Sequence, residues 1–210
     1  RERVERLFAD PTPGDVGIAE VVGIVAECGG LDYARQRGEQ FAQEAEEALA
    51  DARAADMPDV EGRALVLLAE LALHAESDVP RAHDLADAAL AILPVDELAG
   101  LYDAHSLIST IFWWLGDAAG ATRHGEAMLD LAHQADRPEL ESLALTQLAG
   151  VEGVQGHSEE SRAFLDRAAE LAETSGSREA AAFALAVRAR RATEVDLESA
   201  EADLRASLEM

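Results

Sequence analysis

The stretch WWLGDAAGATRHGEAMLDLAH, residues 113–133, decides the fold that the sequence predicts. An apolar helical pattern leads into a Leu-Gly-Asp turn, and a second helical pattern follows it. The second pattern begins with a small side chain, Ala121, and ends with the apolar pair Leu129 and Leu131. A small residue lets a neighbouring helix approach closely, and the apolar pair can anchor the same helix to the next unit. The stretch therefore predicts two helices packed as a hairpin.

The same pattern occurs four times along the chain. The residues that mark the turn are spaced by 39, 40 and 39 positions, and a fixed period of this length indicates stacked repeats. Each marker also follows an apolar helical run, so we expect every unit to be a helical hairpin. The markers are Asp78, Asp117, His157 and Asp196, and the small residues after them are Ala82, Ala121, Ser161 and Ala200.

These segments resemble the tetratricopeptide repeat, which joins two antiparallel helices through a Leu-Gly-Asp-type turn. The best matches are WWLGDAAGA from Trp113 and DAALAILP from Asp87. The slightly long period is similar to that of repeats in large bacterial signalling regulators of the LuxR and AfsR type. The resemblance covers about residues 60–210 and implies an all-α fold, with about four hairpins stacked over 59–210 as a right-handed α-solenoid. It also implies recognition of a protein or peptide on the concave face.

Two positions depart from this resemblance. Seven residues before the turn, the family usually has a small side chain in the first helix, and Ser109 and Ala149 satisfy that pattern. Glu70 and Arg188 occupy the same position in the first and last units and do not. Either the outer repeats are degenerate, as terminal repeats often are, or their first helices are shifted in register.

The segment before the repeats follows a different pattern. Asp15 is expected to cap a helix that runs to about Glu27, and Gly29-Gly30 is expected to end it. A long helix should follow to about Ala55. Its small residue would precede Ala82 by 48 positions, which is out of step with the period. We therefore expect residues 1–58 to form a separate N-terminal helical segment.

The run Cys28–Ala34, CGGLDYA, resembles the C-terminal helices of trans-polyprenyl diphosphate synthases, and the likeness extends over about residues 1–77. It implies the non-catalytic end of an isoprenoid transferase, whose active site would lie upstream. The family's chemistry needs two aspartate-rich motifs that hold Mg²⁺, with lysines on the diphosphate. This chain has no Asp-Asp pair and no lysine. The N-terminal segment is thus expected to be either a synthase tail or a cap on the solenoid.

The charge of the chain limits the classes of partner that it is expected to bind. The formal net charge is −25, and all 17 basic residues are arginines. Such a field repels phosphate backbones and anionic membrane surfaces, so we expect no nucleic-acid partner and no membrane partner. The acids either keep the surface soluble or line a groove for a basic partner. No apolar run is long enough to span a membrane, and the cytoplasm is the expected location.

No motif in the sequence points to chemistry, so we expect neither a catalytic site nor a cofactor. The six histidines include no H-x-x-x-H pair, which argues against a metal site on one helix. Cys28 is the only cysteine and is expected to be a buried thiol beside a helix end.

The repeat register instead predicts a peptide groove lined by the first helix of each hairpin. The two tryptophans end such a helix, and they either pack between repeats or offer an aromatic anchor to a peptide. Adjacent helical residues point about 100° apart, so at most one of the two should be fully buried. The groove candidates are His74, Asp103, Ser106, Thr110, Trp113, Trp114 and Thr146.

The expected function is therefore non-catalytic recognition of a protein or peptide by a scaffold or sensor part of a larger bacterial regulator, with a basic partner favoured. The alternatives are the C-terminal portion of a polyprenyl diphosphate synthase fusion and a self-associating structural module, since open solenoid ends expose apolar surface. The sequence does not set the oligomeric state.

Overall fold

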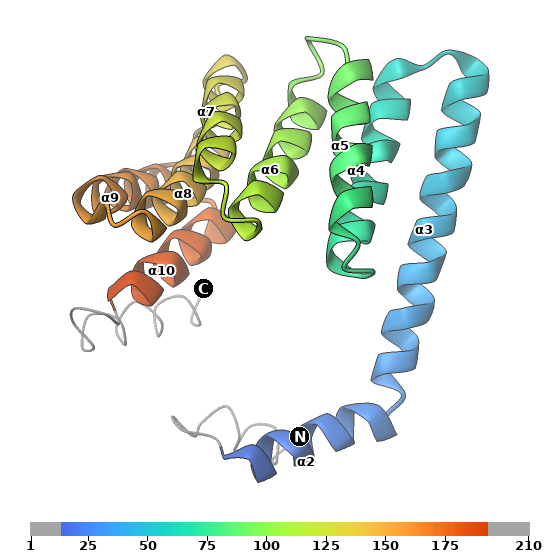
Figure 1. The fold of residues 1–210 in the computed structure, drawn as a ribbon, viewed down its shortest axis with the longest axis horizontal. Helices are drawn as coiled ribbons and strands as arrows, with labels where there is room; N and C mark the ends of the chain where they lie inside the picture. Colours follow the sequence, from blue (N-terminus) through green and yellow to red (C-terminus); the bar gives the residue numbers. More distant parts are fainter. Residues whose placement is uncertain (1–13, 193–210) are drawn as a thin grey trace. The chain divides into compact units, whose positions relative to one another are not determined.

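The computed structural model describes residues 14–192, and every regular element among them is a helix (Figure 1). Two compact units divide the chain, one ending at Glu47 and the other beginning at Ala48. The division falls inside a helix, upstream of the boundary expected at residue 58. The helices are α2 (Asp15–Glu27), α3 (Gly30–Ala55), α4 (Pro58–His74), α5 (Val79–Ile92), α6 (Leu98–Trp114), α7 (Ala118–Gln134), α8 (Pro138–Val154), α9 (Ser158–Ser175) and α10 (Arg178–Ala192).

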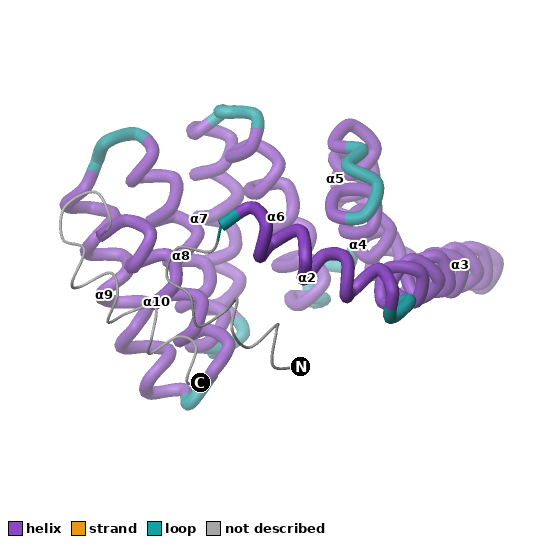
Figure 2. Tube along the Cα trace, turned by 90° about the horizontal axis from the view of Figure 1, so that it is seen from below, coloured by secondary structure: helices purple, strands orange, loops and turns teal. Residues whose placement is uncertain are grey.

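The second unit is a stack of helical hairpins. Helices α4 and α5, α6 and α7, and α8 and α9 pack as pairs, and α10 packs against both α8 and α9 (Figure 2). Each pair packs on the next, α5 against α6 and α7 against α8. The predicted all-α fold of stacked hairpins is confirmed. The second helix of the last unit, with Ala200 and Met210, lies outside the described residues.

In the three hairpins that the structure describes, the repeat marker is the N-cap of the second helix. The Asp78 carboxylate accepts a hydrogen bond from the Arg81 N–H at 3.1 Å, and the Asp117 carboxylate accepts one from the Gly120 N–H at 2.9 Å. Both side chains satisfy a backbone donor that the first turn of a helix leaves unpaired. His157 takes the same position without a side-chain cap. The repeat period in the sequence therefore reflects mainly the recurring N-cap residue of the second helix.

The small residues after the markers lie where the two helices of a hairpin touch. Ala82 and Ala121 are fully buried, and Ser161 is 3% exposed. Their short side chains allow the close helix approach that the sequence predicts.

The first hairpin carries one extra residue in its turn. The Asp78 N–H donates to the Ala72 carbonyl six residues back, whereas the Asp117 N–H donates to the Phe112 carbonyl five residues back. The first helix is therefore shifted by one position, and Ala69, which is fully buried, takes the place held by Ser109 in the next unit. Glu70 is exposed. Of the two explanations for Glu70, the register shift is confirmed. The equivalent comparison for Arg188 needs residues beyond those described.

The end of α3 forms part of the repeat stack. Asp56 and Asp136 have φ angles of 54° and 52°, and each precedes an x-Pro step that begins the next helix. Equivalent ion pairs also flank the two turns. Arg53 lies 2.7 Å from Glu61, and His133 lies 3.4 Å from Glu141.

Leu49 packs against the core cluster that includes Leu65 and Ala89. Residues 48–55 thus belong to the second unit and pack on the core of its first hairpin. This unit therefore extends upstream of residue 59, although the glycine-led start of α3 is out of step with the repeat.

In the first unit, α2 ends where the glycines predict. Gly29 has a φ of 68°, a left-handed conformation that glycine adopts without strain, and α3 starts at Gly30. Two details differ from the expectation. Gly14 is the N-cap of α2 and Asp15 its first residue, with no side-chain cap. Cys28 is exposed, not buried, because it lies at the helix end, where the chain turns.

Among the described helices, none combines the length and the apolar character that crossing a membrane would need.

Candidate functional site

A cavity of about 610 Å³ lies against three helices that each open a repeat, α6, α8 and α10. Aromatic and aliphatic side chains make up much of its wall, and a few polar groups stand among them. This composition is typical of a binding pocket. The lining residues are Tyr102, Asp103, Ser106, Thr110, Trp113, Trp114, Met128, Leu140, Leu143, Thr146, Gln147, Gly150, Glu179, Phe183 and Val187.

One face of α6 supplies most of the predicted groove residues. Asp103, Ser106, Thr110 and Trp114 recur at helical spacing, so their side chains project from the same side of the helix. With Trp113 and Thr146 they make six of the seven predicted residues that line this cavity. Whether these six bind a peptide stays a prediction.

Neither tryptophan is buried. Trp113 is half-buried, and Trp114 is 50% exposed, so its indole presents a large apolar surface to solvent. His74, the seventh predicted residue, does not line the cavity. Its ring meets the Trp114 ring edge-on, with centroids 5.9 Å apart. With the one-residue shift of the first hairpin, His74 is the structural equivalent of Trp114, and it braces that side chain from the neighbouring repeat.

Gln147 links α8 to α6 inside the cavity. Its amide nitrogen lies 3.1 Å from both the Ser106 carbonyl and the Thr110 hydroxyl. The Tyr102 hydroxyl makes a second link between the two helices, donating to the Leu140 carbonyl at 2.8 Å. These side chains join the helices by polar contacts and leave an open space beside them.

Thr146 lines the cavity, but its hydroxyl is not free to face a peptide as the groove prediction implies. Its side chain is fully buried, and its hydroxyl donates to the Ser142 carbonyl one turn earlier on α8 at 2.8 Å. Its hydroxyl is therefore already engaged, and it offers a peptide little polar contact.

Asp103 is the acid that α6 places in the cavity. Burial, together with the nearby acids Glu70 and Glu97, raises the pKa of its carboxyl to about 6, and Arg63 acts in the opposite direction. Arg63 itself lies 3.7 Å from Glu97. Within residues 14–192 no hydrogen bond or ion pair engages the Asp103 carboxylate. The cavity therefore holds a carboxylate that lacks a cation of its own.

A second cluster lies between α5, α6 and α7. The Nδ1 atoms of His105 and His124 are 2.9 Å apart, and the rings of His83 and His124 each pack on Phe112. Burial and the neighbouring histidine lower the pKa of His105. Burial also lowers that of His124, with Arg123 and His83 acting in the same direction and Asp87 against them. At neutral pH one ring of the 2.9 Å pair donates and the other accepts.

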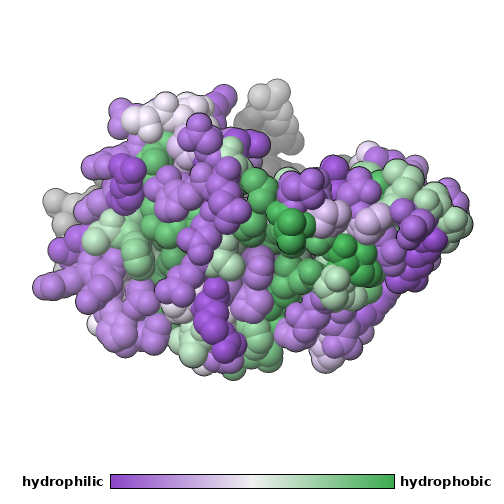
Figure 3. Space-filling view, turned by 90° about the horizontal axis from the view of Figure 1, so that it is seen from above, coloured by the Kyte–Doolittle hydropathy of each residue, from purple (hydrophilic) through white to green (hydrophobic). Residues whose placement is uncertain are grey.

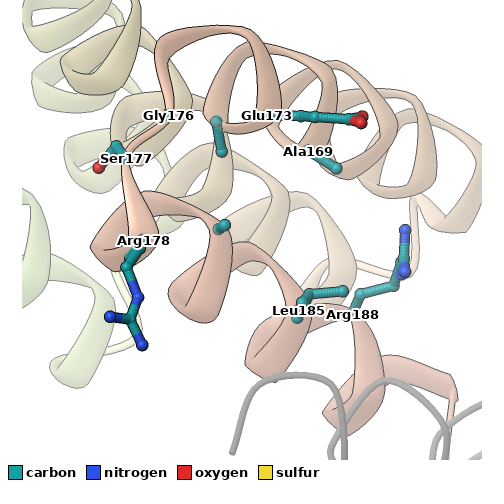
Figure 4. A pocket seen from close by; sticks show the side chains of 9 residues that line it. Ala169, Glu173, Gly176, Ser177, Arg178, Leu185 and Arg188 are labelled. Atoms are coloured by element: carbon teal, nitrogen blue, oxygen red, sulfur yellow. The ribbon is translucent and has the colours of Figure 1, made fainter. Parts of the chain in front are cut away.

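Another cavity, of about 450 Å³, lies between α9 and α10. Figure 4 shows Glu173 on α9, with Arg178 and Arg188 at opposite ends of the α10 wall. Its lining is mostly alanine, glycine and aliphatic surface, and it offers no aromatic side chain. The α6–α8–α10 cavity is therefore the stronger candidate.

In the space-filling view, hydrophilic residues dominate the visible face, and hydrophobic residues are exposed between them (Figure 3).

Between residues 14 and 192, no group of three or more histidine, cysteine, aspartate or glutamate side chains is arranged to hold a metal ion.

Sequence reasoning missed the cavity residues outside α6. Gln147, Phe183 and Glu179 lie on helices that approach α6 only through the stacking of repeats. A weak signal existed for Phe183, because it lies 80 residues after Asp103, one more than the two periods of 40 and 39 residues that separate their units.

A comparison with protein-family models gives no match, and no curated protein matches the chain. Among solved structures, the fold is similar to the crystal structure of BtubC (BKLC) from P. vanneervenii, with a TM-score of 0.63 and 17% sequence identity. The similarity covers 82% of this chain and 72% of that one. At this identity the likeness shows the fold alone.

Proposed function

We propose that this chain is a non-catalytic helical repeat module of the tetratricopeptide kind that binds a peptide segment of a partner protein in the α6–α8–α10 cavity. The observation that carries the proposal is the half-exposed indole of Trp114 in the wall of a cavity of about 610 Å³. Exposed tryptophans in pre-formed hollows are typical anchors of protein interfaces.

The walls of the cavity support this role. Helices α6 and α8 are each fixed in a hairpin and α10 packs against α8 and α9, so a peptide meets a surface that is already ordered and loses less entropy on binding. Leu143, Phe183 and Val187 provide apolar contacts beside the tryptophans. The Ser106 hydroxyl donates to the Gln147 amide oxygen at 3.4 Å and can still accept a hydrogen bond from a peptide N–H.

The charge supports a basic peptide. The net charge of −25 attracts cations at long range and speeds their encounter with the cavity. Asp103 and Glu179 place carboxylates in the wall itself. In this proposal the module is the scaffold or sensor part of a larger bacterial regulator.

The packing of Leu49 against Leu65 bears on the N-terminal segment. It supports residues 48–55 as a cap of the repeat stack over the alternative that residues 1–77 are the tail of a polyprenyl diphosphate synthase.

A display selection tests the proposed function. A library of random dodecapeptides is selected on the wild-type chain and, in parallel, on Trp114→Ala. Leu115→Ala is the matched control, because Leu115 is the next residue, is 65% exposed and does not line the cavity. We expect wild type and Leu115→Ala to enrich the same peptides, rich in arginine or lysine and one large apolar residue, and Trp114→Ala to lose them. Enrichment that survives Trp114→Ala, or none on the wild type, would contradict the proposal.

A further inference from the structure

We infer that the cavity binds two side chains of its peptide at a set spacing, an arginine or lysine at Asp103 and a large apolar residue at Trp114, about four residues apart. This inference rests on the proposed function and adds what the site selects. The two ends of the cavity and the distance between them each follow from a separate observation.

The Asp103 end favours a cation. Its carboxylate lies in the cavity wall, and the one cation among the described residues that acts on it, Arg63, is paired with Glu97 at 3.7 Å. Glu70 and Glu97 add negative potential at this end, and Glu179 on α10 lines the same cavity. The lining residues of α8 carry no charge. A guanidinium or ammonium group placed here would gain a charge-assisted hydrogen bond that no described residue already supplies.

The Trp114 end favours an apolar group. The indole is held edge-on by His74, and about half of its surface faces solvent. Trp113 and Gly150 also line the cavity, so the space there is bounded by aromatic surface and bare backbone. A leucine, methionine or aromatic side chain would bury apolar surface against this wall.

The helix between the two ends sets the spacing. Trp114 follows Asp103 by three turns of α6, so the two residues share a face and lie about 16 Å apart along the helix axis. An extended peptide covers that length in about five residues, since each residue spans about 3.3 Å, but side chains an odd number of residues apart point to opposite faces of the peptide. A separation of four residues keeps both side chains on the cavity side, and the long side chain of an arginine or lysine covers the remaining ~3 Å. The spacing therefore corresponds to three residues between the basic and the apolar side chain.

The electrostatics add a pH dependence. Because the acids around Asp103 and its burial hold its pKa near 6, much of the carboxyl is protonated at pH 5 and little of it at pH 7.5. The tyrosine beside it stays neutral over this range, since burial and the Asp103 charge raise the pKa of Tyr102. Preference for a basic side chain should therefore grow as pH rises through 6.

Spaced peptide pools test the inference. Fluorescein-labelled decapeptide pools carry one arginine and one leucine separated by one, three or five randomised positions, and matched pools carry glutamate in place of arginine. Binding to the full chain is measured by anisotropy at pH 5 and pH 7.5. The variants are Asp103→Asn, Asp103→Arg and, as a charge-matched control, Asp84→Asn, which removes an exposed acid of α5 outside the cavity.

We expect the pool with three randomised positions to bind wild type and Asp84→Asn about tenfold more tightly than the other pools and than its glutamate counterpart at pH 7.5. Asp103→Asn should reduce the arginine preference to about twofold and flatten its pH dependence, and Asp103→Arg should favour glutamate. If pools bind but spacing or Asp103 makes no difference, the inference is overturned and the proposed function stands. If no pool binds the wild type, both fail.

Discussion

Ser109 and Ser161 make the same interhelical hydrogen bond from opposite helices of consecutive hairpins. The Ser109 hydroxyl on α6 donates to the Ala121 carbonyl on α7 at 2.9 Å. In the next unit, the Ser161 hydroxyl on α9 donates to the Ala149 carbonyl on α8 at 2.7 Å. Both serines are buried. These two units thus each pair one serine with one alanine where their helices meet, and only the side that carries the hydroxyl changes.

This exchange predicts a rescue. Ser109→Ala should lower the free energy of unfolding by about 1 kcal/mol, because one buried hydrogen bond is lost. Adding Ala121→Ser should restore most of it, since the double variant copies the arrangement of the next hairpin. Urea unfolding of the wild type, both single variants and the double variant measures the coupling. Purely additive losses would show that the two positions are not equivalent.

The turns of the first two hairpins predict that exchanging serine and glycine at equivalent positions changes stability in opposite directions. Ser77 has a φ of 57°, and Gly116 takes the same turn position with a φ of 77° and open space around the site of a Cβ. A non-glycine residue pays about 1–2 kcal/mol for this conformation, partly offset because glycine gains more freedom when unfolded. We expect Ser77→Gly to stabilise by about 0.5 kcal/mol and Gly116→Ser to destabilise by about 1 kcal/mol in urea unfolding. Equal signs would refute this explanation.

The upstream end of the stack is tested at Leu49. Leu49→Ala should lower the free energy of unfolding of the second unit by about 1–2 kcal/mol, because this half-buried side chain packs on the cluster around Leu65. Phe41→Ala is the control, since Phe41 is 51% exposed earlier on the same helix. Hydrogen exchange of the α4 amides should rise only in the Leu49 variant. Unchanged exchange in both would place the start of the stack after α3.

Asp103 should lower the stability of the chain at high pH. Its pKa is raised to about 6 in the folded state, so the stability that protonation provides is complete below the ordinary value near 3.8 and is lost as pH rises through 6. Asp103→Asn removes this loss. Solvent screens the partly exposed carboxylate, so we expect Tm to rise by only about 2–4 °C at pH 8. At pH 4 the two proteins should melt together, and a gap of the same size there would point to a cause other than ionisation.

Local features of the fold could be predicted from the sequence, and distant ones could not. Asp78 and Asp117 cap helices through bonds to residues three positions away, and Ala82 and Ala121 each lie at the contact between the two helices of one hairpin. These relations are local, so their period is visible in the sequence. The register shift at Glu70 depends on one extra turn residue, which the fixed spacing conceals. The Asp-x-Pro turns at 56–58 and 136–138, two periods apart, could have revealed the repeat-like end of α3.

The same distinction between local and distant relations holds for the residues of the candidate site. Helical periodicity along α6 placed Asp103, Ser106, Thr110, Trp113 and Trp114 on one side, because that relation is local. The positions of Gln147 and Phe183 depend on how three repeats stack. Thr146 was predicted to face a groove. Its side chain is fully buried, and its hydroxyl donates to a carbonyl within α8.

The central claim, that a peptide occupies the α6–α8–α10 cavity, is tested most directly by the fluorescence of the two tryptophans. Trp113 and Trp114 are the only tryptophans in the chain, and both line the cavity. A selected peptide without tryptophan or tyrosine is titrated into the protein, and iodide quenching is followed while calorimetry reports binding. We predict that quenching falls in step with occupancy and that the emission shifts to shorter wavelength. Binding detected by calorimetry with unchanged tryptophan emission and quenching would contradict the account.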